Sequence, residues 1–188
     1  MVDCKCIYIN LKIYFMKNYQ NLILVALTIL IFSCSNRKDF VPTFKGDMDG
    51  KGDWINSKTI GKFGGVTGSY CSRVDSINDY SYGLYKLVSE INPDPIKKAK
   101  VSVWVKLEDL SKKNILVISL KGKDGKSIFW SGHEVNPVIK EIGKWYKFDA
   151  EDVLPDYDMN GTTVEVYVYN PNKNVAYVDD FEIRFFEE

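Results

Sequence analysis

Apolar and polar residues alternate strictly in the second half of the chain. In residues 101–107, VSVWVKL, every second residue is valine or leucine, and in residues 163–169, TVEVYVY, the valines repeat the same pattern. Successive side chains of a β-strand point to opposite faces, so both segments are predicted to be strands with one buried aliphatic face. Val101, Val103, Val105 and Leu107 are expected in the core, as are Val164, Val166 and Val168.

Turn-forming sequences separate the alternating segments. They include NPDP, GKDGKS, MNG and NPNKN, and no long segment shows the period of an amphipathic helix. Many short strands joined by such turns are typical of antiparallel packing in two layers. The sequence therefore predicts an all-β domain, an antiparallel β-sandwich, over residues 43–188.

The N-terminal part has a different character. After Met16 and a basic start, residues 22–32 form a continuous apolar run that is followed by small residues around Cys34. This run is shorter than the roughly 20 residues of a membrane-spanning helix and is typical of a secretion signal. We expect a signal peptide over residues 16–33, with residues 1–15 as translated upstream sequence.

The end of this segment, Ile31-Phe32-Ser33-Cys34, resembles the lipobox of bacterial lipoproteins. The resemblance implies that Cys34 carries lipid and that the protein is anchored in the bacterial outer membrane, on its periplasmic or surface face. Phe32 departs from the usual small residue, and a cleaved signal without lipid is the alternative. Residues 34–42 are polar, end in proline and suit a short tether.

Cysteine content and charge restrict the remaining options. Beyond Cys34 the chain contains a single cysteine, Cys71, so the domain is expected to be stabilised by its core or by a bound ion rather than by a disulfide. The chain has 25 basic and 25 acidic residues and no basic stripe. Nothing in this balance favours nucleic acid as a partner.

Several segments resemble carbohydrate-binding modules when they are taken in order. FKGDMDGKGDW and GGVTGSYCSRV come first, VSVWVKLED lies in the middle, and IGKWYKFDAEDVLPD and VEVYVYNPNKNVAYVDDFEI follow. This order is similar to modules of families four, nine and twenty-two and to the wider galactose-binding-like jelly rolls. The resemblance covers residues 44–184 and implies a jelly-roll fold and a polysaccharide or oligosaccharide ligand.

The same resemblance implies a structural calcium ion. In such modules two aspartates near the end of the last strand lie beside the N-terminal segment, which here places Asp179 or Asp180 near the Asp47, Asp49 and Asp53 group. Calcium takes six to eight oxygen ligands, which clustered carboxylates can supply. Strict alternation puts Asp179 on the face of Tyr177, Phe181 and Ile183, where an unpaired charge is costly. The alternative is that Asp179 accepts backbone hydrogen bonds while Asp180 is solvated.

Aromatic residues on the polar faces of two strands are candidates for sugar binding. Trp104 lies opposite one valine face, and Tyr167 and Tyr169 lie opposite the other, with Glu165 beside them. If both strands belong to one sheet, the rings share one wall with Glu165. Trp130 is a further candidate for this site. The alternative for each ring is ordinary packing.

Enzymatic signatures are missing from the sequence. It contains no nucleophile elbow, no phosphate-binding glycine loop and no Cys/His zinc spacing, and His133 is the sole histidine. We therefore expect a non-catalytic carbohydrate-binding lipoprotein of the cell envelope, with a glycan-processing protein as a further expected partner. The alternative is a structural or protein-interaction β-sandwich lipoprotein without a sugar ligand.

Overall fold

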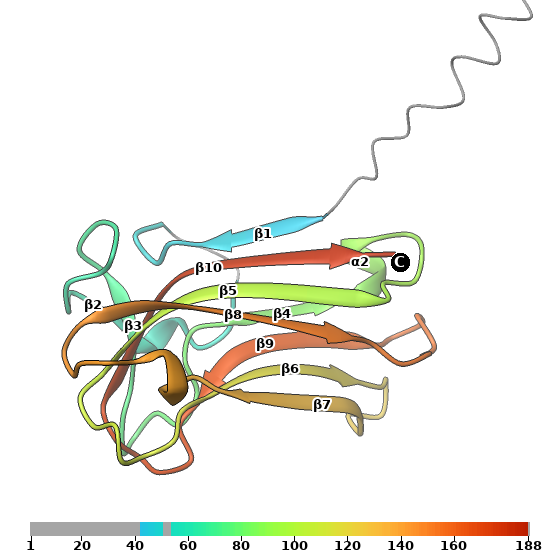
Figure 1. Ribbon diagram of the computed structural model, residues 1–188. Helices are drawn as coiled ribbons and strands as arrows, with labels where there is room; N and C mark the ends of the chain where they lie inside the picture. The colour runs from blue at the N-terminus through green and yellow to red at the C-terminus, as the bar shows by residue number, and fades with distance from the viewer. Residues whose placement is uncertain (1–41, 51–53, 188) are drawn as a thin grey trace, which may run out of the picture. The chain divides into compact units, whose positions relative to one another are not determined.

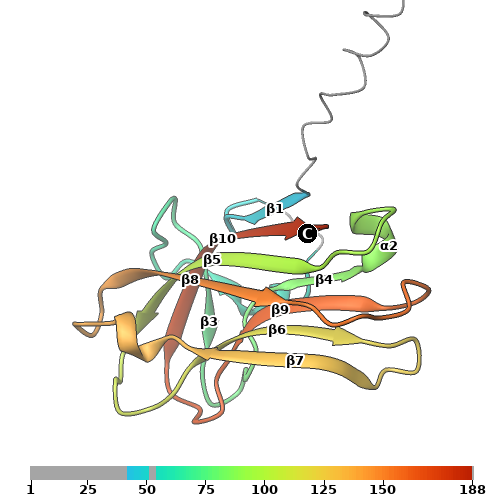
Figure 2. The ribbon, with the colours of Figure 1, turned by 45° about the vertical axis from the view of Figure 1, so that its right-hand side comes forward.

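Two antiparallel β-sheets pack face to face in the computed structural model, which describes residues 42–50 and 54–187 (Figures 1 and 2). The larger sheet has the strand order β2-β3-β10-β5-β8, with β1 also paired to β10, and the smaller has the order β4-β9-β6-β7. The predicted antiparallel β-sandwich is confirmed. The predicted upstream segment, the signal peptide, Cys34 and the tether before Pro42 lie outside the described residues.

Ten strands build these sheets. Their bounds are β1 (Thr43–Gly46), β2 (Ile60–Gly61), β3 (Cys71–Val74), β4 (Leu84–Leu87), β5 (Lys98–Leu107), β6 (Ile115–Lys121), β7 (Ser127–Glu134), β8 (Trp145–Val153), β9 (Thr163–Tyr169) and β10 (Ala176–Phe186). Three short helical segments, η1 (Ser57–Thr59), α2 (Val88–Ile91) and η2 (Asn136–Val138), lie in the connections. Among the described residues, no helix has both the length and the apolar character needed to cross a membrane.

The core lies between the sheets and is formed by the alternating residues. On β5, Val103, Val105 and Leu107 are fully buried, and on β9 the three valines at 164, 166 and 168 are fully buried as well. Both predicted core faces are confirmed. The side chains between them point outward, so each sheet has an outer face that the core does not occupy.

A β-bulge interrupts β10 at the two adjacent aspartates. The register with β5 runs from Asp179 opposite Trp104 directly to Glu182 opposite Ser102, so β10 holds one residue more than its partner there. Asp180 takes a left-handed conformation with φ 47°, which an aspartate tolerates better than most residues.

The bulge changes the facing of the strand. Tyr177 pairs with Lys106 on the outer face, whereas Phe181 and Ile183 beyond the bulge are buried in the core. The expectation that Tyr177, Asp179, Phe181 and Ile183 share one face is therefore wrong. The extra residue shifts the alternation by one position.

Candidate functional site

The outer face of the four-stranded sheet gathers aromatic and polar side chains in regular rows. One row crosses all four strands as Tyr85, Glu165, Ser119 and Trp130, because these residues are directly opposite one another in the ladders. The next rows contain Tyr167 beside Val117, and Tyr169 beside Ile115. We call this surface the tyrosine face, and its aromatic residues are Tyr80, Tyr85, Trp130, Tyr167 and Tyr169.

Three tyrosine rings are in contact at one end of the tyrosine face. Tyr80 comes from the loop before β4, pairs with Tyr169 through an isolated bridge and stacks on its ring at a centroid distance of 5.1 Å. Tyr80 also meets Tyr167 edge to face, at 5.4 Å and an interplanar angle of 87°. Tyr80 is 47% exposed, so it still offers an open ring surface to a ligand.

Trp130 provides the aromatic surface on the edge strand β7. It is 54% exposed, and a Cβ added to Gly132 would come within 2.5 Å of its indole ring. Only a glycine therefore lets the indole lie over the strand at this point. The indole also hydrogen-bonds Tyr167, which opposes the rise that burial causes in the pKa of the Tyr167 hydroxyl. Trp130 is thus held against the central strands.

An ion pair between a buried carboxylate and a partly exposed ammonium forms the polar part of the tyrosine face. The Glu165 carboxylate is nearly buried, and it accepts hydrogen bonds from the Lys121 ammonium at 2.8 Å and from the Ser119 hydroxyl at 3.3 Å. The hydrogen bond to Glu165 raises the pKa of Lys121. A carboxylate and an ammonium that are fixed between exposed rings supply an acceptor and a donor for ligand hydroxyl groups.

Trp104 does not belong to the tyrosine face. It lies on β5, which is in the six-stranded sheet, whereas Tyr167 and Tyr169 lie on β9 in the four-stranded sheet. Both valine faces point into the core, so Trp104 lies on the opposite outer surface. The expected common wall is wrong for Trp104, while Trp130, Glu165, Tyr167 and Tyr169 do share one face.

Asp179 anchors the loop between β2 and β3. The carboxylate is fully buried; its Oδ2 accepts a hydrogen bond from the Val66 amide at 2.7 Å and its Oδ1 accepts one from the Asp180 amide at 2.9 Å. Burial nevertheless raises the pKa of Asp179 from 3.8 to about 6, and the backbone hydrogen bonds only oppose this rise.

Oxygen atoms gather beside Gly65 in the same loop. A Cβ built on Gly65 would meet three oxygens at 2.5 Å, namely Asp179 Oδ2 and the carbonyl oxygens of Thr67 and Tyr70. Calcium prefers such a mixture of carboxylate and carbonyl oxygens. These three oxygens would supply part of the six to eight ligands that calcium takes.

The other predicted metal ligands are distributed differently. Asp49 accepts hydrogen bonds from the Ser69 and Tyr70 amides of this loop, Asp47 accepts one from the Gly50 amide, and Asp180 accepts one from the exposed Thr67 hydroxyl. No three Asp, Glu, His or Cys side chains come together as metal ligands within residues 42–50 and 54–187. Asp53 lies outside these ranges. A calcium site at Asp179 thus depends on backbone carbonyl oxygens.

His133 joins the two sheets at the edge formed by β7 and β8. Its Nε2 lies 2.8 Å from Asp152 Oδ2 and 3.2 Å from Ser131 Oγ, and Ser131 also hydrogen-bonds Asp152. A Ser-His-Asp relay places the serine and the aspartate on different ring nitrogens. Here the same nitrogen meets both partners, so this trio has the geometry of a structural link.

Sequence reasoning missed Tyr80, Tyr85, Ser119 and Lys121. Tyr85 lies in the short strand LYKL, which does not alternate apolar and polar residues, because Leu84 shares a face with Lys86 and Tyr85 shares one with Leu87. Ser119 and Lys121 lie on β6, where buried residues occur on both faces and hide the alternation. Tyr80 lies in a loop, where only the tertiary contact with Tyr169 reveals its place.

Solved structures share this fold. No family model matches the sequence, and no curated protein sequence matches it. The CBM22-1 xylan-binding domain of Paenibacillus barcinonensis Xyn10C gives a TM-score of 0.52 at 13% identity, over 82% of this chain and 99% of that domain. The CBM22-2 xylan-binding domain of the same protein gives 0.50 at 18% identity, over 76% and 98%. This chain thus has the jelly-roll β-sandwich fold of carbohydrate-binding modules.

Proposed function

We propose that this protein is a non-catalytic carbohydrate-binding protein whose glycan lies on the tyrosine face. The observation that carries the proposal is the position of the Glu165–Lys121 pair, whose carboxylate is buried and whose ammonium is partly exposed, among the aromatic rings of a single sheet face. Ring surfaces contact the apolar faces of a sugar, and the ion pair hydrogen-bonds its hydroxyl groups. Neither group alone would favour a sugar over another ligand.

The ring geometry favours a single glycan chain over a crystalline polysaccharide surface. A flat crystal face would need coplanar rings, whereas Tyr80 and Tyr167 are nearly perpendicular. A separate chain can turn its sugar units to follow rings in different planes. Xylan is the first polysaccharide to test, because the two structural neighbours are described as xylan-binding domains.

Alanine at Tyr80 or Trp130 is expected to weaken glycan retention at least tenfold, equivalent to about 1.4 kcal/mol or more. Each ring is half exposed, so its removal leaves the core intact but deletes apolar surface that a sugar would cover. The measurement is affinity electrophoresis and pull-down on soluble xylans, glucans and galactans. Val153→Ala is the matched control, since Val153 is 75% exposed on β8 of the other sheet.

Two results would contradict this proposal. Retention that is unchanged in both ring variants would move the glycan to another surface. A lack of retention on every glycan would favour the alternative, an envelope protein that interacts with other proteins.

Lipid attachment at Cys34 is a second part of the proposal, supported by the lipobox-like residues 31–34. Cys34→Ser is expected to release most of the protein from the membrane fraction into the soluble fraction, because a thioether-linked lipid requires the cysteine sulfur. Metabolic labelling with a fatty-acid analogue, followed by fractionation, measures both effects. Cys71→Ser is the control, and equal labelling of the Cys34→Ser variant would exclude lipid at Cys34.

A structural calcium ion at Asp179 is the third part, supported by the three oxygens that surround Gly65. When bound, calcium would neutralise the buried carboxylate and join β10 to the loop between β2 and β3. Asp179 and the carbonyl oxygens of Thr67 and Tyr70 would hold it.

The outer membrane is the proposed location of the whole protein, where this domain would present the tyrosine face to glycans.

A further inference from the structure

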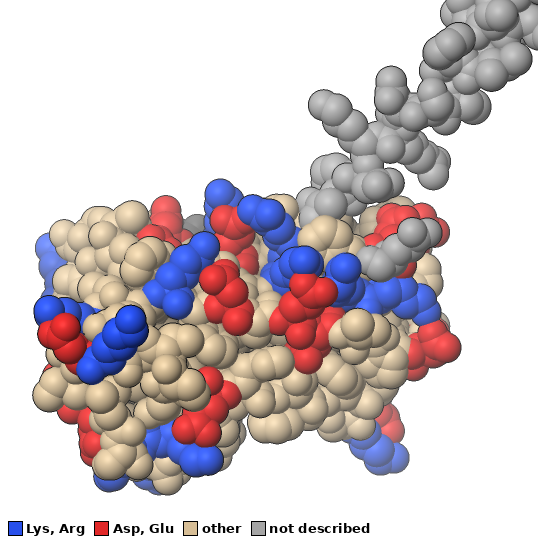
Figure 3. All heavy atoms as spheres, in the orientation of Figure 1, with Lys and Arg blue, Asp and Glu red and all other residues tan. Residues whose placement is uncertain are grey.

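A charged groove lies on the outer face of the six-stranded sheet, which is the side of the sandwich opposite the tyrosine face. It has a volume of about 420 Å³, within the size range of small-molecule sites. It is lined by Ser102 and by long charged side chains from β5, β8 and β10. In Figure 3 basic and acidic side chains lie next to one another over β1, β10, β5 and β8.

Each carboxylate along the groove forms an ion pair with at least one cation. Glu151 pairs with Lys100 at 2.6 Å and with Lys98 at 3.8 Å. These lysines hold the pKa of Glu151 below its ordinary value, and the hydrogen bond to Lys100 is the main cause. Glu151 thus remains ionised and pairs closely with Lys100 at one end of the groove, whereas its pair with Lys98 is long.

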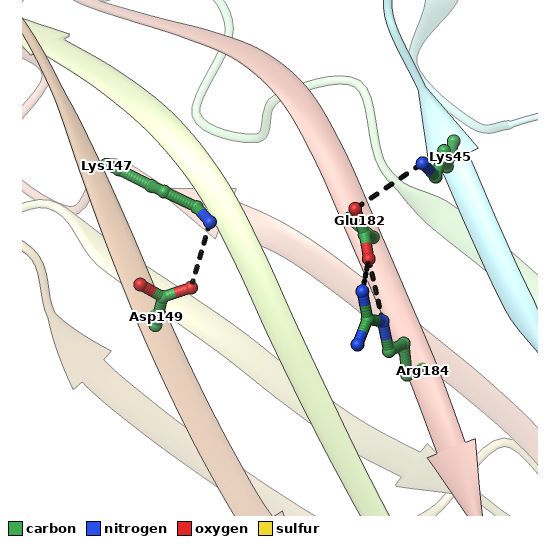
Figure 4. A network of polar contacts seen from close by, with 5 residues as sticks. All are labelled: Lys45, Lys147, Asp149, Glu182 and Arg184. Atoms are coloured by element: carbon green, nitrogen blue, oxygen red, sulfur yellow. Dashed lines mark hydrogen bonds and ion pairs between the residues drawn. The ribbon is translucent and has the colours of Figure 1, made fainter. Parts of the chain in front are cut away.

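The other walls repeat this arrangement. Figure 4 shows Glu182 between Lys45 and Arg184 on one side of β5, and Lys147 beside Asp149 on the other side. The Lys45–Glu182 and Lys147–Asp149 pairs are long, at 3.6 and 3.7 Å. Long, exposed pairs are weak, so both lysines can turn to a ligand at little cost.

The balance of groups indicates the ligand chemistry. The groove is lined by three cations, Lys100, Lys147 and Arg184, and by three carboxylates, Asp149, Glu151 and Glu182, while Lys45 and Lys98 pair with two of these carboxylates from outside it. A neutral sugar would offer the cations no anion, and a bare phosphate or sulfate would face the carboxylates without a donor. A sugar acid has a carboxylate for the cations and hydroxyl donors for the carboxylates.

We propose that this groove is a second binding site, for a uronic-acid unit of an acidic polysaccharide. Lys100, Lys147 and Arg184 contact the sugar carboxylate, and Asp149, Glu182 and Ser102 accept or donate hydrogen bonds to its hydroxyl groups. The site goes beyond the proposed glycan site on the tyrosine face and does not depend on it. With two faces, one protein could bridge a neutral chain and an acidic one.

Binding of polygalacturonate to the full chain tests this proposal, with fully methyl-esterified polymer as the uncharged control. We expect retention of the acid form only, and a loss of about fivefold for each of Lys147→Gln and Arg184→Gln, the upper range for exposed ion pairs. Retention should also fall between about 20 mM and about 500 mM salt, because salt screens exposed charges. Lys126→Gln is the matched control, since Lys126 is ion-paired to Asp124 in the hairpin between β6 and β7 of the other sheet.

The results separate the two sites. Trp130→Ala should leave polygalacturonate retention unchanged, and the Lys147 and Arg184 variants should keep their retention of neutral glycan. Absence of polygalacturonate binding at low salt would overturn the proposal, as would equal retention of the esterified polymer. An equal loss in Lys126→Gln would indicate a general charge effect and would also overturn it.

Discussion

Replacing Asp179 with alanine is expected to lower the free energy of unfolding by about 2–4 kcal/mol in calcium-free buffer. The substitution leaves the Val66 and Asp180 amides without their acceptor at a partly buried site. Each unpaired buried donor costs about 1–3 kcal/mol, and loss of the buried charge offsets part of this cost. Urea-induced unfolding followed by tryptophan fluorescence measures the change.

Asp180→Asn is the matched control for this variant. Asp180 is the adjacent carboxylate, but it is only partly buried and accepts a hydrogen bond from the exposed Thr67 hydroxyl. Asparagine tolerates the left-handed conformation of this residue, so the change should stay within about 0.5 kcal/mol. Equal losses in the two variants would mean that Asp179 does not have the anchoring role described above.

Alternation was sufficient to predict the fold class and the core faces. Every second residue from Val101 to Leu107 and from Val164 to Val168 points inward as expected, because the two-residue period of a strand is a local property. A prediction from local pattern therefore succeeds for both.

The bulge in β10 could not be predicted in this way. Whether two residues lie opposite one depends on the partner strand, and β5 is far from β10 in the sequence. One extra residue placed Phe181 in the core and kept Tyr177 outside. The adjacent aspartates stand where the strand changes its facing, with Asp179 turned to the neighbouring loop and Asp180 in the left-handed conformation.

The candidate site was only partly predictable for a related reason. Alternation identifies outward-facing residues such as Trp104 and Tyr167, but it does not say which strands share a sheet. The topology separates Trp104 from Tyr167 and brings in Tyr80 through a loop contact. Sheet membership depends on long-range pairing, which a single strand's pattern does not contain.

Stability of the calcium-free protein should rise as the pH falls from 7.5 to 5. The folded-state pKa of Asp179, about 6, lies above its ordinary value of 3.8, so the fold binds this proton more tightly than the unfolded chain does. The stability that the neutral carboxyl provides is complete below the ordinary pKa and is lost as the pH rises through about 6. Between pH 7.5 and pH 5 the expected gain is about 1.4 kcal/mol from this group.

Subtracting the same pH series for Asp179→Asn isolates this contribution, because every other titrating group is present in both proteins. Glu151 and Glu182 act in the opposite direction, since their pKa values are lowered and their stabilisation is lost only at more acidic pH. A difference between the two series that is flat from pH 5 to 7.5 would show that the folded state does not raise the pKa of Asp179.

Calcium should cancel this pH dependence if Asp179 binds it. At pH 7.5, calcium at about 100 times its Kd is expected to add about 2.7 kcal/mol to the free energy of unfolding. At pH 5 a proton competes for the carboxylate, and the gain should be smaller by about 1.4 kcal/mol, equal to the stability that the proton itself supplies. The calcium-loaded protein should then show no contribution from Asp179 across this range, and Asp179→Asn should show no calcium effect at either pH.

If calcium stabilises both proteins equally, the ion binds elsewhere, and if it stabilises neither, the oxygens around Gly65 serve only to hold the loop.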